Sequence, residues 1–496
     1  MAGFYRVPGV LAALAVAAVF TGFLLSGTGV LAQTAEGGVE GSAAADMPDY
    51  PIPSKAREAY SPIGEGFESP IEPRADLKAA APPPEEPPQG EDGRRAWLGA
   101  MHQRLQDTSP FFRDTELKAN SRTYWLKLQK FNGTDAEALT SGGYISYQSG
   151  YAGNFLQLRG VLYTSQPLYA PARAGQTLNL EPDGSEITTL GQANVRIKLA
   201  GQELSAGRQL IRTAFINPND NRMIPLTFEG LILVPEHRRD LELDYIASYL
   251  WRYKPRDSDD FIAFSTPFGI EQDEGVLING IRHRTNSFNY GVVNYWIKDT
   301  LNTAYGEVDY LLPFGDGKDG PSYRVSINDL DQRSIGEELI PGAPFNTYQA
   351  SVRLLTSYQG FVLTTAVSTV GKEADIRDPF GNIPVYTSMH QSSFERAGED
   401  AYLVTLSYDF SRLGMEGLKL LAGWGQGVDA VNPRTGAPEP DRDVLNLRLD
   451  YEPHSGPLEG LRLQLYYADE RLIGTTFPRD DQTQLRAVVN YVVPLL

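Results

Sequence analysis

The chain has 496 residues, a formal charge of -18 at pH 7, 48 glycines, 26 tyrosines and no cysteine. The lack of cysteine excludes disulfide frameworks, thiolate nucleophiles and cysteine-ligated metal centres. The negative charge repels nucleic acid, which argues against nucleic-acid binding. The five histidines are scattered singly, so the sequence predicts no metal site and no cofactor.

Residues 1–32 have the pattern of a secretory signal peptide. Arg6 precedes an alanine-rich apolar run, and the small residues that end at Ala32 fit the cleavage rule of signal peptidase. The run is also long enough for a transmembrane anchor, which is the alternative. We expect cleavage after Ala32 and export of the remaining chain.

Residues 33–95 are rich in Pro, Ala and Glu and poor in large apolar side chains. Such a segment buries too little apolar surface to offset the entropy lost on ordering. We therefore predict a disordered periplasmic extension that serves as a spacer, with a binding tail as the alternative. Residues 96–112 are expected to form a short helical or coil lead-in to a folded part at 113–496.

From about residue 113 onward, short segments alternate apolar and polar side chains, the period of a β-strand with two different faces. In one of them Val195, Ile197 and Leu199 share a face, while Arg196 and Lys198 share the other. A membrane-spanning strand needs about nine to eleven residues, and most segments are near that length. About eighteen segments can be counted, beginning at roughly 115, 138, 154, 191, 201, 226, 239, 273, 287, 300, 321, 345, 359, 401, 416, 443, 459 and 483.

A soluble sheet would show the same alternation, but about eighteen strands would normally divide into packed domains with helices or a second sheet. No long amphipathic helix is expected after residue 110, and no apolar run after the signal peptide approaches the length of a transmembrane helix. A closed sheet is then the remaining way to span a bilayer. The predicted fold is all-β, a transmembrane antiparallel β-barrel of about 18 strands, with short turns such as QKFNGTDAE, LAGQE and SYQG on one side and long loops on the other.

Two regions and the end of the chain carry recognisable motifs. The sequence GRQ at 207–209 is followed by an irregular loop and then by R-x-x-P-x-T-F-E-G at 222–230. The first hairpin runs from TYWLKLQ to GGYISYQSGY, and the chain closes with VNYVVPLL. In this order these stretches resemble the corresponding regions of the OprD family of outer-membrane porins. The resemblance covers about residue 110 to the end. It implies an eighteen-stranded barrel, monomeric or homotrimeric, through which small carboxylates or basic amino acids diffuse.

The resemblance also implies that the third loop, here 211–225, folds inward to narrow the pore and that the seventh loop, here 372–400, assists it. A water-filled lumen tolerates irregular charged backbone, and asparagines offer both donors and acceptors to a solute. An ordinary external turn is the alternative for the third loop, because NPNDN is strong turn chemistry. The candidate residues are Arg212, Asn217, Asn219, Asp220, Asn221 and Arg222 in the third loop, and Asp378, Phe380, Tyr386 and Ser388 in the seventh.

Basic residues fall on the polar faces of several strands. A charge that faces lipid at the bilayer midplane costs roughly 2–4 kcal/mol, so these side chains are expected to line the lumen. A strip of fixed positive charge would select solutes by sign. The alternative is that each pairs with a lumenal acid such as Asp244, Asp409 or Asp450. The candidates are Arg159, Arg196, Lys198, Arg353, Arg448, Arg462 and Arg486.

The sequence therefore predicts a porin in the outer membrane that allows passive, charge-selective diffusion of small polar solutes, with a preference for carboxylates or amino acids. Its expected partners are outer-membrane lipids, small anionic or zwitterionic solutes and the barrel-assembly machinery. The alternatives are a structural barrel that tethers the envelope through residues 33–95, and a barrel enzyme. The isolated histidines argue against the enzyme, because hydrolysis needs a clustered nucleophile, base and acid or paired carboxylates.

Overall fold

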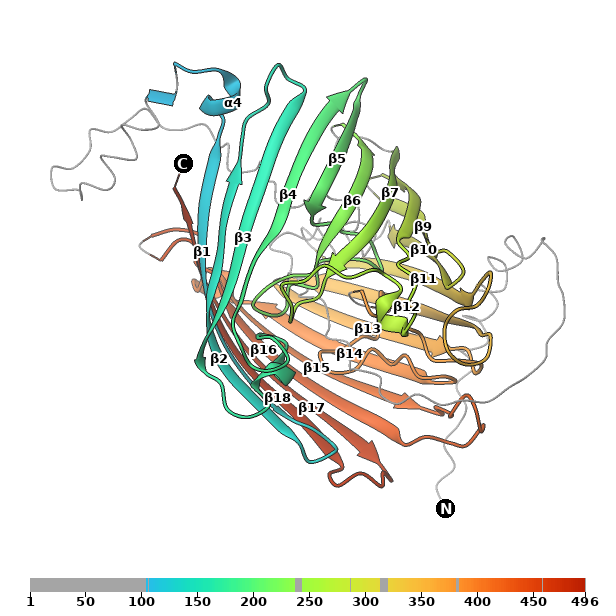
Figure 1. Ribbon diagram of the computed structural model, residues 1–496. Helices are drawn as coiled ribbons and strands as arrows, with labels where there is room; N and C mark the ends of the chain where they lie inside the picture. Colours follow the sequence, from blue (N-terminus) through green and yellow to red (C-terminus); the bar gives the residue numbers. More distant parts are fainter. Residues whose placement is uncertain are drawn as a thin grey trace.

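Eighteen strands form one antiparallel sheet that closes on itself, because the last strand pairs with the first (Figure 1). The computed structural model describes residues 104–105, 107–236, 243–285, 287–312, 320–380, 383–456 and 458–495. The signal peptide and extension predicted for residues 1–95 lie outside the described residues. Within the described part, no helix has the length and apolar character needed to cross a membrane. The predicted class and strand number are confirmed.

The predicted starts differ from the observed ones by no more than four residues. The strands are β1 (Glu116–Gln129), β2 (Asp135–Gln148), β3 (Leu156–Tyr169), β4 (Ile187–Leu199), β5 (Gln202–Gln209), β6 (Thr227–Pro235), β7 (Leu243–Lys254), β8 (Val276–Arg284), β9 (Phe288–Ile297), β10 (Leu301–Leu311), β11 (Ser322–Ser334), β12 (Asn346–Tyr358), β13 (Phe361–Val370), β14 (Asp400–Asp409), β15 (Leu418–Val428), β16 (Asp441–Tyr451), β17 (Leu461–Ile473) and β18 (Asp481–Pro494).

Helices in the described part of the chain are few and short. Helix α4 (Pro110–Arg113) lies at the end of the barrel where β1 begins (Figure 1) and overlaps the end of the segment 96–112 and the first residue of 113–496. Among the described residues, three short 3-10 helices lie in connections: η2 (Ala174–Thr177), η4 (Thr266–Phe268) and η5 (Phe410–Leu413).

The two faces of the sheet are inverted relative to a soluble protein. In β16, Asn446, Arg448 and Asp450 are buried toward the lumen, while Leu445 and Leu447 are exposed on the outside. Exposed Leu, Val, Tyr and Trp side chains cover the outer face of most other strands in the same way. An apolar exterior around a polar interior is the arrangement that a lipid bilayer stabilises.

The connections differ in length at the two ends of the barrel. Connections that follow even-numbered strands have at most ten residues, and the shortest are the two-residue turns at 200–201 and 359–360. In the first, Ala200 and Gly201 have φ of 52° and 77°, a tight turn whose twist matches the flanking strands. The turn at 130–134, in QKFNGTDAE, was grouped with these by its length; this was wrong, because it follows β1 and lies at the opposite end. Four long loops share that end: L2 (170–186), L3 (210–226), L4 (255–275) and L7 (371–399).

Candidate functional site

Loop L3 crosses the interior of the barrel. At one side the backbone N–H of Phe215 donates to the hydroxyl of Tyr295 on β9, at 3.0 Å. At the other side the hydroxyl of Tyr124 on β1 donates to the carbonyl oxygen of Asn221, at 2.7 Å. Strands β1 and β9 are eight steps apart in a ring of eighteen, so they face each other across the lumen. The third loop therefore folds inward and is not an external turn.

Guanidinium groups of the wall hold L3 at the β1–β18 side. Arg122 on β1 pairs with Asp220 at 2.7 Å and donates to the carbonyl oxygen of Arg222 at 2.6 Å. Arg486 on β18 donates to the carbonyl oxygen of Asn221 at 3.2 Å. Charge-assisted hydrogen bonds of this kind are stronger than neutral ones. They fix the position of residues 220–222 in the lumen.

Arg222 lies beneath loop L2. Its Nε donates to the carbonyl oxygen of Thr177 at 2.9 Å, and only 3% of the residue is exposed. The neighbouring backbone N–H of Met223 donates to Oδ1 of Asn179, also in L2, at 3.2 Å. From L4, Arg256 donates to Oδ1 of Asn221. Arg222 and Asn221 thus connect three loops.

Arg212 has a different environment. It is half-buried on L3, and its side chain forms no hydrogen bond or ion pair with any residue that the structure describes. Asn217 accepts from the backbone N–H of Asn219 at 3.0 Å, and Asn219 has a φ of 41°. Asparagine tolerates this left-handed conformation better than most residues. The two asparagines therefore shape the loop, whereas the charge of Arg212 is left without a partner among the described residues.

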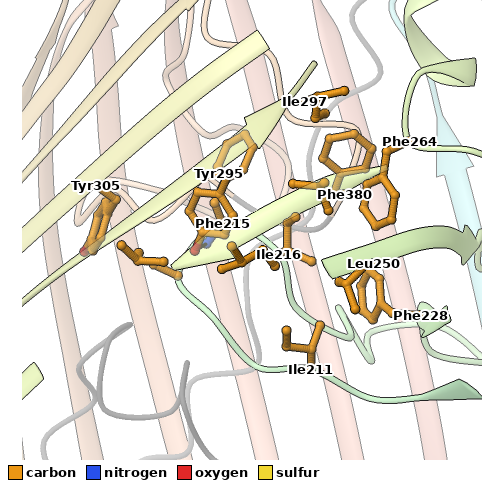
Figure 2. Packing of buried hydrophobic residues seen from close by; sticks show 14 of the residues in the cluster. Ile211, Phe215, Ile216, Phe228, Leu250, Phe264, Tyr295, Ile297, Tyr305 and Phe380 are labelled. Atoms are coloured by element: carbon orange, nitrogen blue, oxygen red, sulfur yellow. Dashed lines mark hydrogen bonds between the residues drawn. The ribbon is translucent and has the colours of Figure 1, made fainter. Parts of the chain in front are cut away.

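An aromatic cluster joins L3, L4 and L7 to the wall. Figure 2 shows Phe215 beside Tyr295, with ring centroids 5.6 Å apart, and Phe264 beside Phe380, with centroids 5.0 Å apart. Phe380 also meets Tyr253 of β7 edge-on at 5.4 Å and is 1% exposed. Phe380 is therefore packed within this cluster, and it positions L7.

Loop L7 lies against two parts of the wall. Its backbone N–H at Tyr386 donates to Oγ of Ser351 on β12, at 3.2 Å, and the guanidinium of Arg353 lies 4.1 Å from the centre of the Tyr386 ring. Further along, His390 stacks on Tyr466 of β17 with centroids 5.1 Å apart. Since β12 and β17 are five steps apart, L7 covers much of this side of the lumen.

His390 is held against β18 as well, where its Nε2 lies 2.8 Å from the side-chain amide nitrogen of Gln484. Burial lowers the pKa of His390 well below its usual value, and the nearby guanidinium groups of Arg486, Arg222 and Arg448 lower it further. The ring is therefore neutral, and Nε2 accepts the hydrogen bond from Gln484.

Buried polar atoms without partners gather in one short stretch of L7. Within the described part of the chain, no hydrogen bond is made by Oγ of Ser388, Oγ of Ser392 or either side-chain polar atom of Gln391. Each such atom costs about 1–3 kcal/mol if it stays unsatisfied. At Asp378, Oδ1 accepts from the backbone N–H of Phe380 at 3.2 Å, which ties this side chain to the backbone of L7.

Four of the seven wall residues have carboxylate neighbours. The ion-pair distances are 2.5 Å for Arg448 to Asp450, 3.9 Å for Arg462 to Asp450, 4.0 Å for Arg196 to Glu203 and 3.2 Å for Lys198 to Glu236. The other two acids considered from the sequence have other partners: Asp244 pairs with Arg282 at 2.9 Å, and Asp409 with Lys419 at 3.7 Å.

The other three wall residues donate to neutral acceptors. Arg159 donates to the side-chain oxygen of Gln148 at 2.7 Å. Arg353 donates to Oγ of Ser326 at 3.0 Å, and Arg486 to the carbonyl of Asn221, as described above. All three are at most 4% exposed and belong to the lumenal face of their strands.

Comparison with known proteins agrees with this architecture. The sequence pattern described as "outer membrane porin, OprD family" matches residues 109–495. The chain belongs to the OprD family. Since this family forms channels in the outer membrane through which small solutes pass, this member is an outer-membrane channel. No individually curated protein matches the chain.

Solved structures of the same fold come from Pseudomonas aeruginosa. Pseudomonas aeruginosa OccK9 (OpdG) is 21% identical, with a TM-score of 0.70 over 78% of this chain and 100% of that one. P. aeruginosa OpdK, solved with vanillate, is 20% identical, with a TM-score of 0.67 over 77% and 99%. P. aeruginosa OccK2 (OpdF), solved with glucuronate, is 18% identical, with a TM-score of 0.67 over 78% and 100%. The eighteen-stranded fold of this OprD-family chain is shared with all three.

Several residues of this OprD-family channel were missed by the sequence analysis. Arg122, His390 and Gln391 were not singled out, although His390 and Gln391 lie in the polar run SMHQSS within the predicted seventh loop. That run was the available signal. Among the described residues, no group of three or more His, Asp or Glu side chains is arranged to hold a metal ion.

Replacing Phe380 with alanine should loosen L7 in this OprD-family channel. Removal of a buried phenylalanine costs about 3–5 kcal/mol, and here the lost contacts join L7 to L4 and β7. We expect larger single-channel conductance and faster proteolysis of L7 in folded protein. Phe477, exposed at the rim between β17 and β18, is the matched control. Unchanged conductance and proteolysis would show that the cluster does not position the loop.

Proposed function

We propose that the chain is a passive, charge-selective channel for small carboxylates. The observation that carries the proposal is Arg212, a half-buried guanidinium without a partner among the described residues, on the loop that crosses the lumen. A fixed cation at a constriction favours anions. The carboxylates bound by two related channels, vanillate in OpdK and glucuronate in OccK2, support the same class of solute.

Besides Arg212, loop L7 would supply contacts to the solute. The partnerless side-chain atoms of Ser388, Gln391 and Ser392 include both donors and acceptors, but they are buried, so a solute would meet them only when L7 moves. Hydrogen bonds to neutral groups are individually weak in net terms, about 0.5–1.5 kcal/mol, which suits a site that must release its solute. Among the sequence candidates, we assign solute contact to Arg212 and Ser388, and anchoring of the loops to Asn221, Arg222, Phe380 and Tyr386.

Replacing Arg212 with glutamine should weaken anion selectivity. The variant removes one lumenal charge without breaking a hydrogen bond, so the fold should be unaffected. Reversal potentials in planar bilayers under a salt gradient measure the effect, with Arg434→Gln in the exposed loop between β15 and β16 as control. Equal shifts in the two variants would remove the constriction assignment. Strong cation selectivity of the unmodified protein would refute the carboxylate proposal and leave the channel intact.

The amino-terminal segments carry proposals of their own. We propose that residues 1–32 are removed on export, so that amino-terminal sequencing of protein from outer membranes should begin at Gln33. Residues 33–95 are proposed as a periplasmic spacer. Deletion of 33–95 that left conductance unchanged but detached the membrane from the cell wall would instead favour the tethering role.

A further inference from the structure

The outer face of the barrel carries a pocket at the end where the long loops lie. Trp296 of β9, Asn302 of β10 and Arg333 of β11 form one row across three adjacent strands, because Asn302 is the register partner of both other residues. All three belong to the outward faces of their strands, which alternate with buried lumenal residues. The cavity measures about 320 Å³. The residues that line this rim pocket are Trp296, Asp299, Asn302, Arg333, Ile335 and Gly336.

Two loops build the upper wall of the rim pocket. Asp299 follows β9, and Gly336 follows β11. The backbone N–H of Leu339 donates to the carbonyl oxygen of Asp299 at 2.9 Å, and Oδ1 of Asp299 accepts from the backbone N–H of Glu337 at 3.3 Å. Gly336 has a φ of 64°, and a Cβ at this position would overlap Oδ1 of Asp299. The two loops therefore hold each other in place above the row of strand residues.

Three donors in the rim pocket have no acceptor among the described residues. They are the indole N–H of Trp296, Nδ2 of Asn302 and Nη1 of Arg333. Arg333 is oriented by its other nitrogens, because Nε and Nη2 donate to Oδ1 of Asp331 at 2.9 and 2.6 Å. Asn302 is oriented by its oxygen, which accepts from Nδ2 of Asn294 at 3.0 Å. The protein thus fixes two of these side chains and leaves one donor of each for a ligand.

The charges around the rim pocket do not favour an anion. Arg333 is paired with Asp331, as described above. Lys298 in the neighbouring loop pairs with Asp299 at 3.4 Å and with Glu274 at 3.7 Å. Because each cation has at least one carboxylate beside it, the pocket has no excess of positive charge with which to attract a phosphate.

A neutral ring that carries hydroxyl groups matches these features. Its hydroxyl oxygens can accept from the three donors, and its C–H bonds can pack on the negative face of the Trp296 ring. The cavity lies within the usual range for small-molecule sites, about 300–1,000 Å³. The chemistry is therefore that of a sugar.

The depth of the rim pocket limits where such a sugar comes from. Long loops of these barrels lie on the outside of the cell, and outward aromatic residues mark the membrane interface. Trp296 is exposed, and Val292 and Tyr290 follow it on the same lipid-facing side of β9. A solute in the lumen cannot reach this side, because the wall lies between. The sugars that meet the pocket are headgroups of lipids in the outer leaflet.

Two acceptors lie one strand repeat deeper, about 7 Å below the row. Asn294 and Asp331 are the register partners of Ala304 on either side, and the small side chain of Ala304 leaves space between them. Oδ1 of Asn294 and Oδ2 of Asp331 accept no hydrogen bond from any residue that the structure describes. The ester linkages of a phospholipid offer only acceptors at this depth, whereas an amide linkage offers an N–H donor.

We propose that the rim pocket binds an N-acylated amino sugar, the headgroup of a glycolipid in the surrounding outer leaflet. The sugar ring packs on Trp296, its hydroxyls accept from Asn302 and Arg333, and its amide N–H donates to Asn294 or Asp331. This site lies outside the channel, so it is separate from the passage of solutes.

Native mass spectrometry of the folded full-length protein in detergent tests the proposal, with fully dephosphorylated lipid A as the probe and phosphatidylethanolamine as the comparison lipid. We expect the probe to bind more tightly than the phospholipid, and Trp296→Leu to weaken its binding about tenfold. The matched control is Trp424→Leu, because Trp424 is 44% exposed against 40% for Trp296 but has the apolar register partners Val404 and Leu445. Single-channel conductance should be unchanged in both variants.

A second variant, Asn302→Leu, suits the lipid face and should weaken binding of the probe to a similar degree. Heat-dependent mobility on gels verifies that each variant is folded. Equal affinity of the unmodified protein for the probe and the phospholipid would overturn the proposal without any variant. Binding of phosphorylated lipid A alone would mean that phosphate is recognised instead of the sugar. Equal weakening by Trp424→Leu would reduce the contact to unspecific lipid association.

Discussion

Replacing Arg442 with methionine is expected to release the end of loop L7 and to lower the free energy of unfolding by about 3–5 kcal/mol, the usual cost of removing one partner from a buried ion pair. Arg442 on β16 pairs with Glu399 at 2.6 Å, Glu470 at 3.5 Å and Glu395 at 3.6 Å, and is 7% exposed. The variant leaves these carboxylates buried with less compensation. Urea unfolding in lipid vesicles and single-channel recording measure the two effects.

The charges around Arg442 show why no neighbouring cation compensates for its loss. Arg396 already pairs with Glu399 at 2.6 Å and with Glu439 at 3.8 Å. Arg442 and Arg396 together therefore pair with four carboxylates, those of Glu395, Glu399, Glu439 and Glu470. Burial raises the pKa of Glu395 above its ordinary value of 4.5, while the charge of Arg442 opposes this shift, so loss of Arg442 removes a charge that keeps Glu395 ionised.

Arg471→Met is the control, because this exposed arginine pairs with Asp469 at 3.3 Å on the outer face of β17. Surface pairs contribute about 0–1 kcal/mol, so stability and conductance should be nearly unchanged. If Arg442→Met were as mild as this control, the ionic cluster would not be what holds L7 in the lumen.

Replacing Arg222 with methionine is expected to separate L3 from L2 and widen the constriction. The variant removes hydrogen bonds to the carbonyl oxygens of Thr177 and Asn221, both at 2.9 Å, at a site that is 3% exposed. Hydrogen bonds that involve a charged group contribute about 1.5–3 kcal/mol each. We expect lower stability, larger conductance and entry of larger solutes, measured by unfolding and by liposome swelling.

Replacement of Arg212, on the same loop, is expected to have a different effect from replacement of Arg222. Its replacement should change ion selectivity with little change in stability, whereas Arg222→Met should change stability and pore size more than selectivity. The reverse pattern would mean that Arg222 contacts the solute and that Arg212 holds the loop.

Strand positions and faces were predictable because a barrel wall has a strict period of two. In β16 the alternation of leucine with Asn446, Arg448 and Asp450 sufficed to orient every side chain. The partners were not predictable, because they depend on the register between strands. The alternation of apolar and polar residues predicted that Arg448 and Arg486 both face the lumen. Only the structure shows that Arg448 pairs with Asp450 and that Arg486 donates to the backbone of L3.

The sequence indicated where the long loops occur, but not which residues they contact. The irregular, charged sequence of L3 was enough to predict that this loop enters the pore. Arg222 and Arg212 are equivalent in that sequence, but Arg222 is buried and hydrogen-bonded while Arg212 has no partner among the described residues. L2 and L4 carry no periodic pattern, so their support of L3 through Thr177 and Arg256 could not be foreseen. Phe380 was chosen as a pore residue because it lies in the seventh loop, and the structure packs it against Phe264 and Tyr253.

The mutual support of the four inward loops has a consequence for assembly. L3 rests on L2, L4 and β1, and L7 rests on L4 and β17, so strands distant in sequence must already be in place before either loop can settle. Contacts between distant parts of a chain form late, because closing a large loop costs entropy before the contact stabilises it. The narrow passage is thus among the last features to form. A barrel that is incompletely assembled is a wider hole in the membrane than the finished protein.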